Sequence, residues 1–386
     1  MKNISRRELL LTSAKVASGL AAASALPSTA AAAPRAARVP RRARIRFAAI
    51  GMNHGHINSQ VEAVKRGGGE LVSYFAREPE LAAQFGRRNP DAKLARSEAE
   101  ILEDPSIQLV VAAPIPNERA GLGIRVMQAG KDYMSDKPGV TTLEQLAEVR
   151  RVQAETRRIY SIMYSERFEN RATVKAGDLV KAGAIGDVIQ TIGLGPHRMN
   201  APTRPAWFFD RDAYGGIICD IASHQLDQFL FFTGSTSGEI LAAQVGNLHH
   251  PQYPGLEDFG DLMVHGNRGS GYVRVDWFTP DGLPTWGDGR LTVLGSQGYI
   301  EIRKNVDIGG RPGGSHLFVV DGKGVQYIDS SDVELPYGEQ LVDDVVNRTE
   351  TAMSQEHCFL ATELALRAQA AARVITGTQD PPAPSR

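Results

Sequence analysis

A carboxylate and an imidazole, Asp220 and His224, stand four residues apart within the run Gly216–Asp227. If this run is helical, the spacing places both side chains on one face, one turn apart. The neighbouring residues are apolar, so the helix is expected to be largely buried, and two buried polar side chains need partners or a chemical role. Proton transfer at a bound substrate is one such role. A structural helix with two satisfied polar residues is the alternative.

A lysine with a restricted backbone is the second chemical feature. Lys137 precedes Pro138 and follows a short strand-like stretch, Asp132–Met134. Proline restricts the residue before it to extended backbone, so Lys137 would point in one direction. Open α/β sheets bind ligands at the carboxyl ends of their strands. Lys137 therefore joins Asp220 and His224 as a candidate catalytic residue, although a Lys-Pro step also occurs in ordinary turns.

The elements that must position these side chains fall into two parts. In residues 45–160, apolar strand-like runs alternate with helix-like segments. After Gln108, the run Gln108–Ala113 is uniformly apolar, as in strands that are buried on both faces. The alternation predicts a Rossmann-like, doubly wound parallel sheet. The expected strands and helices are Ile45–Ile50, Ile57–Arg66, Leu71–Phe75, Glu78–Phe85, Gln108–Ala113, Ala120–Ala129, Asp132–Met134 and Leu143–Arg157.

Residues 161–377 show longer extended segments separated by turn residues, such as Val188–Leu194 and Gly271–Phe278. This pattern predicts a mainly antiparallel sheet with a few helices, including the one around Asp220. The whole chain is therefore expected to combine an α/β half with an α+β substrate and oligomerisation domain. An exposed sheet face would favour a homo-oligomer. Residues 378–386 are expected to form a disordered tail.

The turn after the first expected strand, Gly51–His56, occupies the position of a dinucleotide-binding fingerprint. A full GxGxxG pattern needs glycine at 51, 53 and 56, whereas this chain has asparagine and histidine at the last two positions. Asn53 tolerates left-handed backbone and can still form the turn. The two histidines of the turn can donate hydrogen bonds to phosphate or cap the following helix. We therefore expect a cofactor at this turn, bound by a modified motif.

The second expected strand ends without the acidic residue that usually binds the adenosine ribose. Its last residue, Phe75, is followed by alanine and then Arg77. A guanidinium pairs with a ribose 2′-phosphate, so NAD(P) is expected, with NADP favoured over NAD. Alternatively, Arg77 is a solvated loop charge, and Glu78 or Glu80 binds the ribose. The expected cofactor-binding residues are Gly51, Asn53, His54, Gly55, His56, Arg77, Pro114 and Lys137.

Composition excludes several classes of protein. The chain has 386 residues, 42% of them hydrophobic and 23% charged, with a net charge of −1. These values are typical of a soluble globular protein of about two domains, with no electrostatic reason to bind nucleic acid. The two cysteines, Cys219 and Cys358, exclude a disulfide framework and lack metal-ligand spacing. The adjacent His249 and His250 would not face one way on a strand, so we predict no metal site.

The amino terminus resembles a twin-arginine export signal. Arg6 and Arg7 precede an Ala/Ser/Leu stretch and an Ala-x-Ala site within residues 1–33. A basic linker follows at residues 34–44. We therefore expect export by the twin-arginine machinery, to the periplasm or another exported location. An ordinary secretory leader with two chance arginines is the alternative.

Taken together, the motifs resemble those of the Gfo/Idh/MocA family of sugar oxidoreductases, over about residues 44–377. Asp136–Pro138 is similar to that family's Glu-Lys-Pro step, with a change of one acid for another, and Gly216–His224 is similar to its Gly-Gly-x3-Asp-x3-His motif. Gly295–Glu301 is similar to a typical late strand of the carboxyl-terminal domain. The chain departs from the family pattern at its glycine fingerprint, at the missing ribose acid, and at Arg119, near where many members carry histidine.

The resemblance implies a nicotinamide at the strand ends, a sugar or polyol between the two domains, and hydride transfer between a substrate carbon and the nicotinamide ring. Lys137 would orient the substrate hydroxyl and assist its deprotonation. His224 would serve as general acid or base, and Asp220 would orient the substrate or the imidazole. Which of Lys137 and His224 takes the proton varies within the family.

Further polar and aromatic side chains are candidates for contact with a sugar ring. An indole suits the apolar face of a sugar, although Trp207 could equally be a core residue. The expected substrate-binding residues are His197, Arg198, Trp207, Tyr164 and Arg167, with Glu166 and Trp286 as weaker candidates. The sequence thus predicts an NAD(P)-dependent oxidoreductase of a sugar, polyol or glycoside. A nicotinamide-dependent glycoside hydrolase or lyase that uses transient oxidation, and a non-catalytic sugar-binding protein, are the alternatives.

Overall fold

The computed structural model describes residues 44–376. The expected export signal (1–33), nearly all of the expected linker (34–44) and the expected tail (378–386) lie outside the described residues. Among the described residues, no helix combines the length and the apolar character that crossing a membrane requires.

The first half is built on a six-stranded parallel sheet of order β3-β2-β1-β4-β5-β6. All four residues of β4 are buried, as its apolar run predicts. Strand order reverses between β2-β1 and β4-β5, which places a ligand-binding crevice at the carboxyl ends of β1 and β4. The predicted doubly wound sheet is confirmed. Its strands are β1 (Ile45–Ile50), β2 (Gly69–Phe75), β3 (Lys93–Leu94), β4 (Leu109–Ala112), β5 (Asp132–Ser135) and β6 (Tyr160–Ile162). The last of these spans the domain boundary expected after residue 160.

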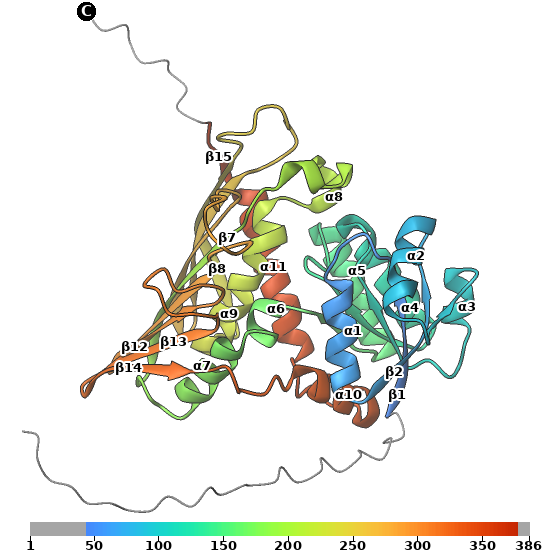
Figure 1. Ribbon diagram of the computed structural model, residues 1–386, viewed down its shortest axis with the longest axis horizontal. Coiled ribbons are helices and arrows are strands. Elements are labelled where there is room, and N and C mark those ends of the chain that lie inside the picture. Colours follow the sequence, from blue (N-terminus) through green and yellow to red (C-terminus); the bar gives the residue numbers. More distant parts are fainter. Residues whose placement is uncertain (1–43, 377–386) are drawn as a thin grey trace, which may run out of the picture. The chain divides into compact units, whose positions relative to one another are not determined.

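Helices cover this sheet, and one of them comes from the far end of the chain. They are α1 (Ile57–Arg66), α2 (Pro79–Arg88), α3 (Glu98–Leu102), α4 (Arg119–Gln128), α5 (Leu143–Thr156) and α10 (Tyr337–Asn347). Figure 1 shows α10 beside α1. The two backbones approach so closely that a Cβ on Gly338 would lie 1.9 Å from the carbonyl oxygen of Ala63. Only glycine permits this contact, so the first half is completed by a helix that follows β14 of the second half.

The second half contains a nine-stranded, mainly antiparallel sheet of order β14-β13-β12-β11-β7-β10-β9-β8-β15, as predicted. Helices α7 (Arg171–Lys181), α9 (Ser223–Thr233) and α11 (Gln355–Ala371) pack on one face (Figure 1). The opposite face carries exposed apolar side chains, namely Ile192, Met263, Leu294, Tyr299 and Val325. The strands are β7 (Val188–Pro196), β8 (Gly238–Gly246), β9 (Phe259–Gly266), β10 (Gly269–Asp276), β11 (Arg290–Gly295), β12 (Gly298–Arg303), β13 (His316–Asp321), β14 (Gly324–Asp329) and β15 (Arg373–Val374).

The segment around Asp220 is not the regular α-helix that the sequence predicts. A short helix, α8 (Arg211–Tyr214), is followed by Gly215 and Gly216, whose φ angles of 87° and 95° require glycine. A π-helical turn, η4 (Ile218–Ala222), then leads directly into α9. Such turns are rare and often mark functional sites. Asp220 therefore lies in the π turn, whereas His224 lies in the first turn of α9.

Candidate active site at the carboxyl ends of the parallel strands

The loop between β1 and α1 offers backbone donors to an anion. Gly51 has a φ of 75°, and a Cβ there would lie 2.7 Å from the Cβ of Pro114, so only glycine fits. Gly55, by contrast, has open space around it. Within the described part of the chain, the backbone N–H groups of Asn53, Gly55 and His56 have no acceptor. Free donors before a helix form a ready site for phosphate, so this loop fits a pyrophosphate although its glycine pattern is incomplete.

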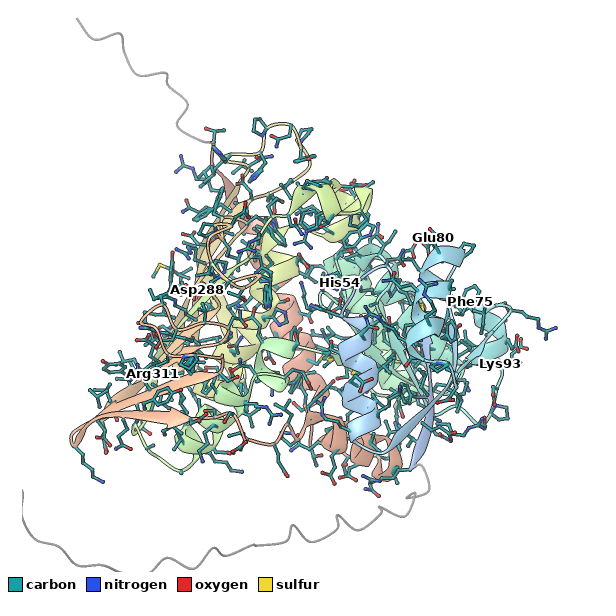
Figure 2. All side chains as sticks on the ribbon, in the orientation of Figure 1. His54, Phe75, Glu80, Lys93, Asp288 and Arg311 are labelled. Atoms are coloured by element: carbon teal, nitrogen blue, oxygen red, sulfur yellow. The ribbon has the colours of Figure 1, made fainter. Side chains whose placement is uncertain are left out.

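A narrow cavity of about 30 Å³ lies beside this loop and at the end of β2. Gly51, Asn53, Arg77, Glu78 and Pro114 are among the residues that line it. The amide of Asn53 donates to Glu78 Oε1 at 2.9 Å, and Arg77 forms an ion pair with Glu118 at 2.9 Å. Figure 2 marks this region by Phe75 at the end of β2 and Glu80 in α2. The Arg77 guanidinium, which the sequence suggested as a partner for the 2′-phosphate of NADP, is therefore already paired with Glu118. Glu78 is the carboxylate in this cavity that can accept hydrogen bonds from an adenosine ribose.

Lys137 and Asp220 form an ion pair that joins the two halves. Lys137 Nζ lies 2.8 Å from Asp220 Oδ1, and both side chains are largely buried. Burial raises the pKa of Asp220, but the Lys137 ammonium outweighs it and holds that pKa below its usual value. The structure thus brings two of the predicted catalytic residues together. No hydrogen bond between described residues joins Asp220 to His224, so the carboxylate is paired with Lys137 and not with the imidazole.

His224 instead lines a second cavity, of about 190 Å³. The cavity is bounded chiefly by His56, Glu166, His197, His224, Trp286 and Lys304. Burial lowers the pKa of His224 to about 3 and that of His197 to about 4, and in both cases Glu166 opposes the shift while Lys137 adds to it. Both imidazoles are therefore neutral near pH 7. Lys137 does not line this cavity, but Asp136 Oδ1 accepts from the Lys137 backbone N–H and also contacts His56, which does line it, so the ion pair and the cavity are adjacent.

Asp136 is the centre of a cluster that the sequence did not reveal. Its Oδ1 accepts from the backbone N–H of Lys137 at 2.8 Å and lies 2.8 Å from His56 Nδ1. Its Oδ2 lies 3.1 Å from the Arg119 guanidinium and 2.9 Å from His54 Nδ1, although that imidazole is poorly aligned for a hydrogen bond. Burial raises the pKa of Asp136, but the positive groups around it hold the pKa well below its usual range.

This cluster also explains how the loop histidines are placed. Figure 2 shows His54 at the amino-terminal end of α1. His56 occupies the helix-cap position, yet its side chain makes no cap hydrogen bond because the ring is turned to Asp136. The ligand atoms of His54, His56 and Asp136 lie within 4.8 Å of one another, a spacing compatible with a metal ion. The carboxylate is already surrounded by donors and by Arg119, so the arrangement does not require a cation.

Two further residues of the cavity were not found from the sequence. Lys304, one residue after β12, forms a buried ion pair with Glu166, which also accepts from Gln225 at 2.9 Å. Burial raises the pKa of Glu166, but Lys304 outweighs it and the pKa falls to about 2. The next residue, Asn305, also lines the 190 Å³ cavity. No local motif marks Lys304, because its role depends on a partner 138 residues away.

Several predicted substrate-binding residues have structural roles instead. Tyr164 is buried, and its hydroxyl contacts the Thr362 hydroxyl at 3.0 Å. Its ring packs edge to face against His224, with the ring centroids 6.1 Å apart. Arg167 lines a different cavity, near α7 and α10, and binds Asp227 through two hydrogen bonds of 2.7 Å. Arg198 is directed to backbone carbonyls in residues 280–283. Trp207 is half-buried beside His54, with ring centroids 6.4 Å apart. Of the predicted substrate-binding residues, His197 and the two weaker candidates, Glu166 and Trp286, line the 190 Å³ cavity.

Comparisons with known proteins agree with this fold. A family profile described as "Oxidoreductase family, NAD-binding Rossmann fold" matches residues 45–164, and one described as "GFO/IDH/MocA C-terminal domain" matches residues 173–301. A crystal structure of an oxidoreductase from Erwinia carotovora atroseptica SCRI1043 is 46% identical, with a TM-score of 0.84 over 86% of this chain and 99% of that chain.

Two other relatives carry named activities. The 1,5-anhydro-D-fructose reductase of Ensifer adhaerens is 26% identical over 215 residues, which cover 54% of this chain and 61% of that protein. The chain thus spans less than two thirds of this curated relative. Levoglucosan dehydrogenase, solved in complex with NADH and levoglucosan, is 16% identical, with a TM-score of 0.71 over 84% of this chain and 97% of that chain. At this identity the likeness concerns the fold alone.

Proposed function

Because this chain belongs to the Gfo/Idh/MocA family of NAD(P)-binding oxidoreductases, we propose that it transfers hydride between a nicotinamide dinucleotide and a small sugar or polyol. One observation carries the proposal: the Lys137–Asp220 ion pair joins the cofactor-binding half to the half that supplies the 190 Å³ cavity. The reductase relative favours this activity over glycoside hydrolysis or non-catalytic sugar binding.

The residues present fit the cofactor. The free N–H groups of the β1–α1 loop would hold the pyrophosphate, and Asn53 and Glu78 would hold the adenosine ribose. The nicotinamide, when bound, supplies the hydride acceptor or donor. Lys137, fixed by Asp220, would hold the substrate oxygen at the strand ends, and its ammonium would stabilise the negative charge that develops there. His224 would donate or accept a hydrogen bond from a substrate hydroxyl.

The second cavity favours a small hydroxylated substrate. Its 190 Å³ is below the range of about 300–1,000 Å³ typical of sites for drug-sized ligands. Its walls carry neutral imidazoles and a charge-balanced Glu166–Lys304 pair, which suit hydroxyl groups better than a charged substrate. The exposed indole of Trp286 at this cavity can pack on the apolar face of a sugar ring.

A direct experiment tests the function. Purified protein is titrated with NAD⁺ and NADP⁺ by fluorescence, and the absorbance of the reduced nicotinamide is then followed with a panel of monosaccharides, anhydrosugars and inositols. Cofactor binding with turnover of at least one member is expected. The proposal fails if neither dinucleotide binds.

Glu78 is expected to set a preference for NAD over NADP, opposite to the preference that Arg77 suggested. The Glu78 carboxylate would repel a 2′-phosphate, and Arg77 is neutralised by Glu118. Replacing Glu78 with serine should lower the NAD-to-NADP ratio of kcat/KM by about tenfold or more, a change of about 1.4 kcal/mol. Glu80→Ser is the matched control, because Glu80 does not line the cavity. An unchanged ratio in Glu78→Ser would contradict this assignment.

We also propose a homo-oligomer that buries the outer face of the nine-stranded sheet, since exposed apolar residues recur there on four strands and the neighbouring β14. Light scattering during size-exclusion chromatography measures the mass of the protein in solution. A monomer at micromolar concentration would count against the proposal. Charge substitution at Ile192, on the central strand β7 of that face, should shift the assembly toward monomer.

Export by the twin-arginine route is proposed from Arg6 and Arg7 and the stretch that follows them. Substitution of both arginines by lysine is expected to retain the protein in the cytoplasm. Cell fractionation with an antibody to the folded protein measures the distribution, and unaltered export would support an ordinary secretory leader.

A further inference from the structure

The protonation of His56 follows from its contact with Asp136. The Asp136 pKa lies well below its usual range, because nearby positive groups outweigh the effect of burial, so this carboxylate can only accept hydrogen bonds. The His56 Nδ1 that lies 2.8 Å from Oδ1 must then be the donor. A neutral imidazole with a protonated Nδ1 has a lone pair on Nε2. Because Nδ1 is occupied by Asp136 and His56 lines the 190 Å³ cavity, Nε2 is the ring nitrogen that can interact with a ligand in this cavity.

The other basic groups near the cavity are poorer proton acceptors. Lys137 is paired with Asp220 as an ammonium and has no lone pair. His224 and His197 are neutral, but burial opposes their protonation, as their pKa values of about 3 and about 4 indicate. A proton on His56 would instead lie next to a carboxylate. Its side chain is 38% exposed, so the proton can pass on to water.

We infer that His56, oriented by Asp136, is the group that accepts the substrate hydroxyl proton during oxidation. This inference rests on the proposed function. In the step, the substrate C–H bond breaks and its electron pair leaves as hydride to the nicotinamide, the O–H bond breaks and its proton bonds to His56 Nε2, and a carbonyl forms. In the reverse direction the imidazolium returns the proton. The histidine that replaces the last glycine of the fingerprint is thus a catalytic residue, with Asp136 as its positioning residue.

The tautomer of His56 is the first test, and it needs no turnover. The full-length, cofactor-free protein is labelled with ¹⁵N-histidine, and the His56 signals are assigned by their loss in His56→Gln. A protonated Nδ1 and an unprotonated Nε2 are expected near neutral pH. His250 provides an internal reference, because its Nδ1 lies 2.8 Å from the buried carboxylate of Asp258, outside the cavity. A protonated Nε2 with a bare Nδ1 at His56 would overturn the inference.

Kinetics of matched variants form the second test. His56→Gln is expected to lower kcat by about 10²–10⁴-fold, the usual contribution of a general base, while the Kd for the dinucleotide stays unchanged. His250→Gln, which breaks an equivalent contact elsewhere, should keep wild-type kcat. Added imidazole should restore part of the kcat of His56→Ala.

Each result separates this inference from the proposed function. Wild-type protein that binds no dinucleotide counts against the proposed function. Active wild-type protein together with an equally active His56→Gln counts against this inference alone, as does a loss that is fully explained by weaker cofactor binding. Inactivation by EDTA with recovery on adding Zn²⁺ would also overturn it, because a cation would then occupy the histidine and carboxylate atoms.

Discussion

Lys137→Met is expected to lower kcat/KM by about 10²–10³-fold, the usual cost of losing one donor to a developing negative charge. Methionine keeps the length of the side chain but cannot stabilise a substrate oxygen. The substitution also leaves Asp220 without its partner at 2.8 Å, so the thermal midpoint should fall. Adding Asp220→Asn should recover part of the midpoint but none of the activity. Steady-state kinetics and thermal unfolding of the single and double variants measure the two effects separately.

Lys131→Met is the matched control. Lys131 precedes β5 and Lys137 follows it, so the two buried lysines lie at opposite ends of one strand. Lys131 Nζ is directed to backbone carbonyls, including that of Ile107 at 3.1 Å, far from the strand ends that bind ligands. This variant should lose stability and keep kcat/KM. Full activity in Lys137→Met would reduce Lys137 to a structural partner of Asp220.

Arg167→Leu is expected to destabilise the fold by about 3–5 kcal/mol, because it leaves a buried carboxylate with one partner fewer. Arg167 makes two hydrogen bonds of 2.7 Å to Asp227 and also packs over the ring of Phe168. The remaining neighbour of Asp227 is His357, whose Nε2 lies 2.8 Å from Oδ1. Since Arg167 lies outside the substrate cavity, KM should not change. Thermal unfolding and substrate kinetics of one preparation measure both.

The stability lost in Arg167→Leu should depend on pH in one direction. Burial raises the pKa of Asp227, but Arg167 and His357 outweigh it, so the folded pKa lies below the usual value. A carboxyl group with a depressed folded pKa stabilises the fold above its unfolded pKa, about 3.9, and the contribution is lost as pH falls through the folded value. The difference in the free energy of unfolding between Arg167→Leu and the wild type should therefore be largest at neutral pH and become smaller below about pH 4.

Arg151→Leu is the control for this stability prediction. Arg151 forms two ion pairs on the exposed face of α5, with Glu148 and Glu155, and its side chain is 51% exposed. Exposed pairs of this kind contribute about 0–1 kcal/mol. A raised KM in Arg167→Leu with an unchanged midpoint would restore Arg167 to the substrate site.

The sequence predicted the architecture well because strand and helix periodicity is local. α1 was expected at Ile57–Arg66 and is found there, and the expected strand at 108–113, which is apolar after its first residue, contains the fully buried β4. The strands β13 and β14 were missed, since both lie among glycine-rich turns and β14 is largely exposed. The π turn at Ile218–Ala222 was also missed, because its residues read as an ordinary helix.

The site was predictable only where a motif carried it. Lys137 was identified from the Lys-Pro dipeptide and Asp220 from its spacing to His224, and the structure brings the two side chains together. The role of Asp136 could not be read, because its partners His56 and Arg119 come from two other loops and helices. Tyr164 and Arg167 were misassigned for a related reason. Polar residues at a domain junction resemble a substrate wall in sequence, and only their partners Thr362 and Asp227 show that they support the core.

The close contact between Ala63 of α1 and Gly338 of α10 bears on when this protein can fold. A ribosome makes α1 about 270 residues before it makes α10, the helix that covers it (a spacing from residue 66 to residue 337). During synthesis the cofactor-binding half therefore lacks one of its covering layers until nearly the whole chain has emerged. This packing can form only after β7 to β14 have been made, and any step that requires a finished fold has to wait for α10.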